Sequence, residues 1–311
     1  MLSRVAERAY WLARYLERAE NTARFVNVYS TLLLDLPRSA GLGWDLALRI
    51  NGSAAAFAAT GQQATALHML QYLLHDSANP SSLLGSLTMA RENTRTTRDI
   101  VPTEIWRAVN ELCLYARQNL PAAVAERQRA EVMAHVVASV QGITGMLAGT
   151  MSQGQPYQFI RMGRNLERAD MTTRMIDVAA AVLMTGRPEL ERYNNTLWMT
   201  VLRCLSGYQM YRQYVRRRVQ GPDVLAFLLQ DNEFPRALNH CVNEVVAALT
   251  VLPRSEQAVA CAQSMSDQLA RLEPAALDNR GVHQLVDELQ LKIAEINDAI
   301  ATTWFYLEDQ A

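Results

Sequence analysis

Residues 14–24 read RYLERAENTAR, and residues 164–174 read RNLERADMTTR, so one charged pattern occurs twice at an offset of 150 positions. Over the longer stretches 14–28 and 164–178, eight of fifteen positions are identical, where ordinary composition predicts about one. At about 100° per residue, most charges of each copy fall on one stripe of a helix and apolar residues on the opposite one. The repeat therefore predicts two long helices that carry the same charged feature.

Apolar residues also flank the charged stripe of both copies. Trp11 and Phe25 lie beside the stripe of the first copy, and Phe159 lies beside that of the second. A helix that is apolar around most of its circumference is largely buried. Buried charges must pair with one another or with a ligand. We therefore expect the helices at 5–28 and 159–184 to be adjacent.

A third charged block, residues 90–99, lies between the two copies. It contains Glu-Asn-Thr at 92–94, as residues 20–22 do, and an arginine follows shortly after each. We expect the charged and amide side chains of the three blocks to form a binding site, with each copy contributing one helix to a shared polar centre, as facing helices do in bundles. The candidate residues are Arg14, Glu17, Arg18, Glu20, Asn21, Arg24, Arg91, Glu92, Asn93, Arg164, Glu167, Arg168, Asp170 and Arg174.

Three interpretations of this Arg/Glu set remain open. The charges can be an ion-pair network that fixes helix register. They can form an anion pocket, in which the arginines at both ends of each copy bind a carboxylate or phosphate while Glu17 and Glu167 orient them. Either glutamate can instead act as a general acid or base. Asn21 and Met171 occupy equivalent positions, and only Asn21 can hydrogen-bond through an amide, so we expect ligand chemistry to concentrate on the first copy.

Composition narrows the class of protein. The 311 residues carry a formal net charge of −1, which argues against broad electrostatic binding to nucleic acid. Lys292 is the only lysine, so basic charge is almost entirely arginine. The four cysteines show no Cys-x-x-Cys pairing, and Arg4, Glu7 and Arg8 interrupt any N-terminal signal peptide. These features predict a cytoplasmic protein with reduced thiols.

Familiar catalytic and cofactor motifs are missing from the sequence. It has no Gly-rich phosphate loop, no Gly-x-Ser-x-Gly elbow, no His-Glu-x-x-His and no paired Glu-x-x-His. The five histidines are dispersed, and we expect each to be structural. We therefore predict no metal site and no directly bound cofactor, and the two glutamates named above are the catalytic candidates. A Cys/His pair also stays open, because its members meet in space rather than in sequence.

Helical periodicity fills the chain and strand patterns are nearly absent, which predicts an all-α bundle of about ten helices. The chain is expected to be one domain, 1–311, with possible halves 1–150 and 151–311 related by the repeat. Asn79 before Pro80 predicts the N-cap of a helix.

The stretch 132–160 contains no Asp, Glu, Lys or Arg. Its first ~20 residues are long enough to span a bilayer, but polar residues such as Gln141 interrupt it and a Gly-Pro turn ends it. We expect a buried central helix rather than a membrane span. Gly142, Gly145 and Gly149 would then let a neighbouring helix approach closely.

Several segments beyond the repeat stand in a specific order: residues 1–24, 79–82, 90–93, 104–110, 163–174, 206–211 and 224–236. In this order they resemble the bacterial alpha-E family, an all-helical domain named for its repeated Glu-Arg motif. The resemblance covers most of the chain.

The resemblance implies association with a circularly permuted ATP-grasp protein, and a transglutaminase-like protein as a further possible partner. It also implies a role in amide or peptide bond formation, with ATP and magnesium bound by the ATP-grasp partner. We therefore expect an accessory or substrate-handling subunit of a ligase system, whose Arg/Glu site takes a carboxylate or phosphate group. The alternatives are an enzyme in its own right, using Glu17 or Glu167, and a scaffold with a purely structural ion-pair network. No nucleic-acid or membrane partner is expected.

Overall fold

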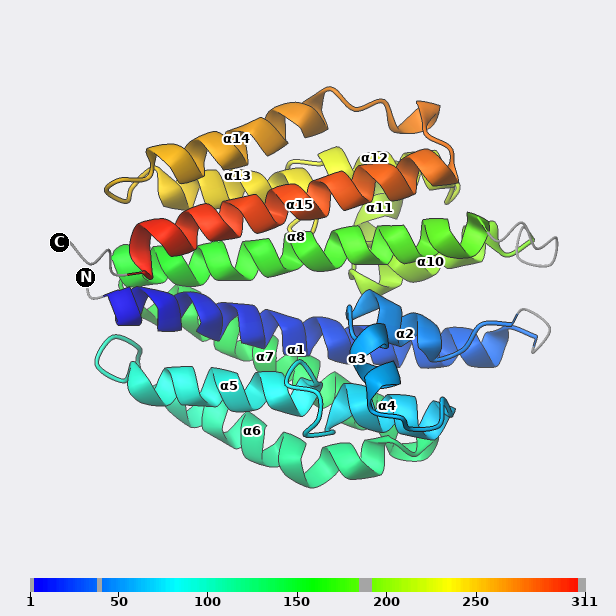
Figure 1. Ribbon diagram of the computed structural model, residues 1–311, viewed down its shortest axis with the longest axis horizontal. Coiled ribbons are helices and arrows are strands. Elements are labelled where there is room, and N and C mark those ends of the chain that lie inside the picture. The colour runs from blue at the N-terminus through cyan, green and yellow to red at the C-terminus, as the bar shows by residue number, and fades with distance from the viewer. Residues whose placement is uncertain (1–2, 38–40, 185–191, 307–311) are drawn as a thin grey trace. The chain divides into compact units, whose positions relative to one another are not determined.

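The computed structural model describes residues 3–37, 41–184 and 192–306, and these residues form helices and connections without any strand (Figure 1). The prediction of an all-α fold is confirmed. The described residues hold more helices than the ten expected, partly because residues 45–59 form two helices of only six residues each, α2 (Asp45–Ile50) and α3 (Ala54–Ala59). Gly186-Arg187-Pro188, a sequence whose glycine and proline predict a break between helices, lies outside the described residues.

The chain divides into two compact units. Unit 1 comprises Met1–Tyr10 and Gln153–Ala311, and unit 2 comprises Trp11–Ser152. The long helix α1 (Ser3–Asp35) contributes its first residues to unit 1 and the remainder to unit 2. The second copy of the repeat therefore belongs to unit 1, and the first copy belongs to unit 2.

Unit 2 is built around α6, which packs against both α5 and α7. Apolar residues recur on the inner face of α6 at helical spacing, including the fully buried Ile105, Val109 and Leu120. Beyond α1, α2 and α3, its helices are α4 (Ala66–Leu74), α5 (Leu83–Thr96), α6 (Thr103–Ala123) and α7 (Glu126–Thr150).

Arg129 fastens the α6–α7 turn to the rest of unit 2. Its guanidinium donates to the backbone oxygens of Ala123 at 3.2 Å and Val124 at 2.6 Å. It also donates to Ser30 Oγ on α1 at 3.1 Å and lies 5.4 Å from the centre of the Trp44 ring. Burial lowers the pKa of this guanidinium. The arginine thus supplies donors to carbonyls at the end of α6 that have no partner within the helix.

Unit 1 is built around α8, which packs against both α13 and α15, while α14 covers the same two helices. Buried residues are found on all sides of α8, which the apolar flanks of the second copy had indicated. The helices of this unit are α8 (Gln155–Met184), α10 (Asn194–Cys204), α11 (Tyr208–Tyr214), α12 (Gly221–Gln230), α13 (Leu238–Leu249), α14 (Glu256–Ala270), the 3-10 helix η2 (Pro274–Ala276) and α15 (Asn279–Trp304).

The start of α1 lies directly against α8 within unit 1. A Cβ atom at Gly163 would collide with the backbone oxygen of Tyr10. The Tyr10 hydroxyl donates to Asn297 Oδ1 of α15 at 2.7 Å, and the Tyr10 ring contacts Phe305 with 5.3 Å between ring centres. For the part of α1 that belongs to unit 1, the predicted contact with the second-copy helix is therefore present.

The helix α7 corrects one prediction. It has the length and apolar composition of a membrane-crossing helix, but only 33% of its most apolar window is buried. No atom of the described residues lies within 4 Å of a Cβ built on Gly142, Gly145 or Gly149. The helix is therefore not a buried central one, because small residues, rather than large apolar ones, make up its uncharged outer face.

The start of α5 corrects another prediction. Ser82, not Asn79, is the N-cap, and its hydroxyl accepts from the Gly85 backbone N–H at 3.1 Å. Asn79 is buried in the preceding turn, where its amide donates to the Tyr72 backbone oxygen at 3.0 Å and its Oδ1 accepts from the Ser81 N–H at 3.0 Å. Both residues offer a capping oxygen, so the sequence pattern alone did not decide between them.

Candidate functional site

The first copy of the repeat places charged and amide side chains in the interior. On α1, the exposed fractions are 8% for Arg14, 2% for Glu17, 1% for Glu20 and 2% for Asn21. Glu20 pairs with Arg24 one helical turn later, with its Oε1 at 2.8 Å from Nε and 2.7 Å from Nη2. The i, i+4 spacing brings these two side chains together on one helix face.

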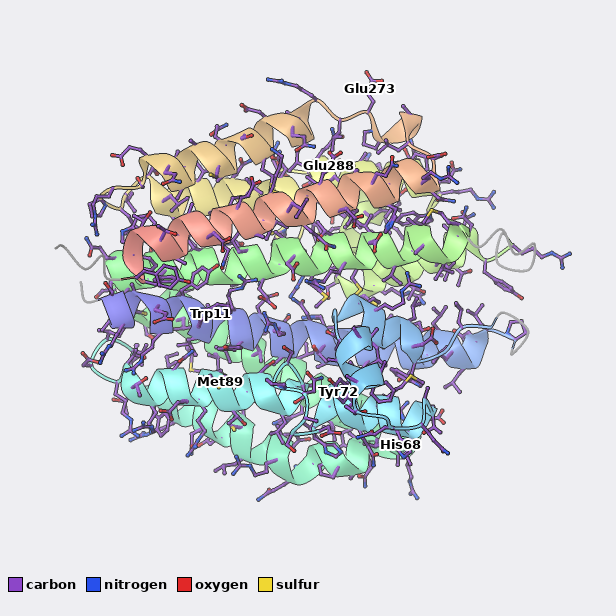
Figure 2. The ribbon with its side chains drawn as sticks, viewed as in Figure 1. Trp11, His68, Tyr72, Met89, Glu273 and Glu288 are labelled. Carbon is purple, nitrogen blue, oxygen red and sulfur yellow. The ribbon has the colours of Figure 1, made fainter. Side chains whose placement is uncertain are left out.

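Two arginines of the first copy also lie over aromatic rings of α1. The Arg14 guanidinium carbon is 5.2 Å from the centre of the Trp11 ring, and that of Arg18 is 5.7 Å from the centre of the Tyr15 ring. Trp11 is labelled on α1 in Figure 2. Guanidinium groups stack favourably on aromatic faces. Each ring precedes its arginine by three positions, so the helix itself holds the two cations in place.

The second copy repeats the ion pair of the first. On α8, Asp170 Oδ2 accepts from Arg174 Nε at 2.8 Å, across the same i, i+4 spacing as Glu20 and Arg24. Glu167, the counterpart of Glu17, is also 2% exposed. Arg164 and Arg168 are half-buried. The copies therefore share a buried glutamate and an acid–arginine pair.

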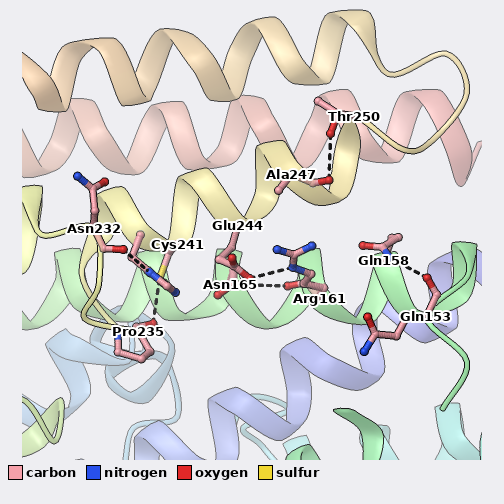
Figure 3. Close-up of polar contacts among 11 residues, drawn as sticks. Gln153, Gln158, Arg161, Asn165, Asn232, Pro235, Cys241, Glu244, Ala247 and Thr250 are labelled. Carbon is pink, nitrogen blue, oxygen red and sulfur yellow. Dashed lines mark hydrogen bonds and ion pairs between the residues drawn. The ribbon is translucent and has the colours of Figure 1, made fainter. Parts of the chain in front are cut away.

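Sequence reasoning missed an ion pair that joins α8 to α13. Arg161 Nε donates to Glu244 Oε2 at 2.8 Å (Figure 3). This hydrogen bond holds the pKa of Glu244 below its usual value, and the nearby positive charges of Arg161, His240 and Arg164 act in the same direction. The partners are 83 residues apart in sequence and belong to no motif, so only the packing of α13 on α8 could reveal the pair.

Arg236 lies in the interior of unit 1. It is 6% exposed, and its backbone oxygen accepts from Thr172 Oγ1 of the second copy at 2.9 Å. Thr22, the counterpart of Thr172, is also buried, but its hydroxyl has no hydrogen-bond partner among the described residues. The environments of the two copies therefore differ at this position.

The third block has a different character. Glu92 and Arg95 form a solvent-exposed pair at 2.7 Å, with side chains 50% and 49% exposed, so Glu92 does not share the buried environment of Glu20. Arg91 Nε donates to Asn110 Oδ1 of α6 at 2.6 Å, and the Arg91 guanidinium carbon lies 5.7 Å from the centre of the Trp106 ring. The amide nitrogen of Asn93, another candidate of this block, is buried without a hydrogen-bond partner within the described ranges.

Metal-ligating side chains and thiols are the other groups of chemical interest in the described residues. These residues contain no cluster of three or more His, Cys, Asp or Glu side chains that could hold a metal ion. The cysteines are free thiols; Cys113, Cys204 and Cys241 are buried, and Cys261 is half-buried. Burial raises the pKa of Cys204 to about 12, so this thiol stays protonated and unreactive at neutral pH.

The arrangement offers buried carboxylates and arginines in each unit, which suit binding of an anionic group or fixing of helix register. The shared polar centre, formed by one helix from each copy, stays a prediction. So does the expected concentration of ligand chemistry on the first copy.

Comparison with known proteins gives the chain a family. Residues 1–305 match Alpha-E, described as "a predicted alpha-helical domain with a conserved ER motif". Uncharacterized proteins of Mycobacterium bovis and of two Mycobacterium tuberculosis strains are each 25% identical to it over 325 aligned positions, covering 96% of this chain and 35% of the relative. The chain thus spans about a third of the length of the curated relatives it matches. No solved structure matches it. On the match over residues 1–305, the chain belongs to the Alpha-E family.

Proposed function

We propose that the chain is an accessory or substrate-handling subunit of an ATP-grasp-type amide or peptide ligase system, in which its buried Arg/Glu groups receive a carboxylate or phosphate group. The observation that carries the proposal is that Glu17 and Glu167, at matching positions of the two copies, are each 2% exposed. Removing a charged group from water costs several kcal/mol. Because the chain buries a glutamate at the same motif position in both copies, we infer that the charge of this glutamate serves a function.

The chemistry of such a ligase supports an anion-binding role. ATP-grasp reactions activate a carboxylate as an acyl phosphate, so a substrate-handling subunit would meet carboxylate and phosphate oxygens. Arginines bind both through charge-assisted hydrogen bonds. The sequence has no phosphate-binding loop, so ATP and magnesium would belong to the partner, a circularly permuted ATP-grasp protein.

The length of the relatives also supports a chain that works with additional polypeptide. The matched segment makes up 35% of each curated relative. We propose that this chain acts in the cytoplasm in a complex with the ATP-grasp partner, and that a transglutaminase-like protein can be a further component.

A scaffold is the second candidate, and the two i, i+4 ion pairs favour it. Glu20 with Arg24, and Asp170 with Arg174, satisfy acid and base within a single helix. Charges that are already paired can fix helix packing without any ligand.

Coexpression with the ATP-grasp partner, followed by pull-down and an ATP-consumption assay, tests these candidates. The informative variants are Glu17→Gln and Glu167→Gln, which keep shape and remove charge. Glu111→Gln is the matched control, because Glu111 is an exposed glutamate on the helix α6 and is not one of the candidate site residues.

A subunit that handles substrate should lose ATP-dependent ligation in both interior variants, with the melting temperature nearly unchanged and the Glu111 variant active. A scaffold should lose stability in both, by roughly 3–5 kcal/mol, because each change strands buried arginine. Turnover by the isolated chain that disappears with Glu17 or Glu167 would instead identify an enzyme in its own right.

A further inference from the structure

A cavity of about 460 Å³ lies in unit 2, where the end of α1 and the starts of α2 and α4 meet. This volume is within the range of small-molecule binding sites. Most of the wall is apolar and includes Leu36, Leu42 and Met69. Ala64 and Ala66, which also line the cavity, are exposed to solvent. The cavity therefore offers an apolar surface that a ligand can reach from outside.

The aromatic part of the wall is held in place by residues that do not line the cavity. The Tyr29 hydroxyl donates to the backbone oxygen of Gly43, the residue before Trp44, at 2.8 Å. The Trp44 ring packs edge-on against Tyr29 with 5.5 Å between ring centres, and the Arg129 guanidinium carbon lies 5.4 Å from the centre of the Trp44 ring. A wall that is fixed before binding loses little conformational entropy when a ligand arrives.

Asp45 is the only ionisable side chain among the described residues that line the cavity. Its carboxylate has no ion pair or hydrogen bond within the described ranges. A Cβ atom at Gly43 would lie 2.8 Å from Asp45 Oδ1, so the glycine leaves room for this carboxylate at the wall. The Arg129 guanidinium is buried behind Trp44 and does not line the cavity. The charge that a ligand meets in the cavity is therefore negative.

We propose that this cavity binds a small organic cation, a primary ammonium compound with an aliphatic or aromatic body. The body packs against Leu36, Leu42 and Met69, and its burial supplies most of the binding free energy. The ammonium group lies beside Asp45, which favours a positive ligand and repels a negative one.

This site is separate from the Arg/Glu groups of the repeat, and the binding itself does not rest on the proposed function. An amide ligase joins a carboxylate to an amine, so in the ligase system proposed above a ligand of this class would be the amine component. Because the binding is measured on the chain alone, failure of the ligase proposal and failure of this one are distinguishable.

Titration of the full chain with 2-phenylethylammonium at neutral pH tests the proposal, without ATP and without any partner protein. The comparison ligands are 2-phenylethanol, which is neutral, and 3-phenylpropionate, which is negative, because both have nearly the same apolar body. Ligand-detected saturation-transfer NMR measures the dissociation constants. We expect saturable binding of the ammonium, about threefold or more tighter than that of the alcohol, because an ion pair that is partly exposed to water contributes modestly. The carboxylate should bind most weakly.

Asp45→Asn is the variant that tests the charge. It should weaken binding of the ammonium about threefold or more and leave binding of the alcohol unchanged, because it removes the negative charge and keeps the shape of the side chain. Asp99→Asn is the matched control, because Asp99 is an exposed aspartate of the same unit that does not line the cavity. It should bind all three ligands as the wild type does.

Ala66→Leu is the variant that tests the location. Leucine is compatible with the helix α4 at this exposed position, and its larger side chain takes up space at the cavity wall. Binding of the ammonium and of the alcohol should therefore weaken alike, by about tenfold or more. Ala134→Leu is the matched control, because Ala134 is an exposed alanine of α7 that does not line the cavity.

Three results would overturn the proposal. The first is the absence of saturable binding, or binding of the alcohol or the carboxylate as tight as that of the ammonium. The second is an Asp45→Asn variant that binds the ammonium as tightly as the Asp99→Asn variant. The third is an Ala66→Leu variant that binds as tightly as the Ala134→Leu variant, because the ligand would then be bound elsewhere.

Discussion

At the scale of single residues, one acid–arginine pair occurs in two environments. Glu20 and Arg24 have side chains 1% and 14% exposed, whereas Asp170 and Arg174 are 18% and 31% exposed. The geometry is nearly the same, since the Nε–oxygen distance is 2.8 Å in both. Burial, rather than bond length, therefore decides how much each pair matters, because water screens the second pair more strongly.

Glu20→Gln should consequently destabilise the protein more than Asp170→Asn. We expect a loss of roughly 3 kcal/mol in the free energy of unfolding for Glu20→Gln, because the 1%-exposed Glu20 carboxylate no longer balances the charge of Arg24, whose side chain is only 14% exposed. For Asp170→Asn we expect about 1 kcal/mol or less. Urea unfolding of both variants measures the difference. Equal losses would show that burial does not control these pairs.

The Arg161–Glu244 pair makes a pH-dependent contribution to stability. Its hydrogen bond holds the folded pKa of Glu244 below the usual value of a glutamate. A lowered folded pKa stabilises the fold above the unfolded pKa, and this contribution is lost as the pH falls through the folded value. The stability difference between wild type and Glu244→Gln should therefore be constant from about pH 6 upward and shrink below about pH 4.5. Urea unfolding across this range measures it, and a difference independent of pH would contradict the assignment.

At the scale of elements, glycines occur both where two helices are in tight contact and on an open helix face. Gly163 on α8 leaves no room for a Cβ because the Tyr10 backbone oxygen occupies that space. At Gly145 on α7, no atom within the described ranges comes near the same position. One glycine is thus required by packing, whereas the other only weakens its helix.

Alanine substitutions at these two glycines should have opposite effects. Gly163→Ala should destabilise the protein by about 1–3 kcal/mol, because a backbone oxygen cannot move aside as a side chain can. Gly145→Ala should stabilise it by up to about 1 kcal/mol, because alanine favours the helix. Thermal unfolding of both variants tests the pair of expectations. Destabilisation by Gly145→Ala would mean that its face is in contact with something.

Sequence patterns predicted where the helices are more accurately than which helix faces are buried and which residues cap them. The spacing of apolar residues in the repeat was enough to predict the helices α1 and α8, because a helix buried on several sides has apolar residues on several faces. The lack of charge between 132 and 160 was misleading for α7, since small residues avoid charge without being buried. The choice between Asn79 and Ser82 as a cap depended on tertiary contacts of Asn79 with Tyr72, which no local pattern contains.

The candidate site could be predicted in part. The burial of Glu17 and Glu167 follows from the repeat, because identical charges recur within apolar flanks. The pairing of Arg24 with Glu20 follows from i, i+4 spacing and agrees with the ion-pair interpretation, one of the three that the sequence left open. The ion pair of Glu244 could not be predicted from the sequence, because its partner Arg161 is distant in sequence and the two meet only through helix packing.

At the scale of the whole molecule, the chain carries ionisable groups but no nucleotide-binding motif. The purified chain should therefore show little ATP hydrolysis or ligation by itself, and activity should depend on the added ATP-grasp partner. A coupled ADP-release assay on the isolated chain measures this. Robust turnover that survives removal of contaminating kinases would contradict an accessory role.

The distribution of thiols gives each unit its own reporter of opening. Cys113 is buried in unit 2 and Cys204 in unit 1. A thiol must ionise and meet its reagent to react, and the Cys204 pKa of about 12 prevents this while unit 1 is closed. The alkylation rates of these two cysteines, followed separately by mass spectrometry, therefore report how often each unit transiently unfolds. A ligand bound to one unit should lower the alkylation rate of the cysteine in that unit.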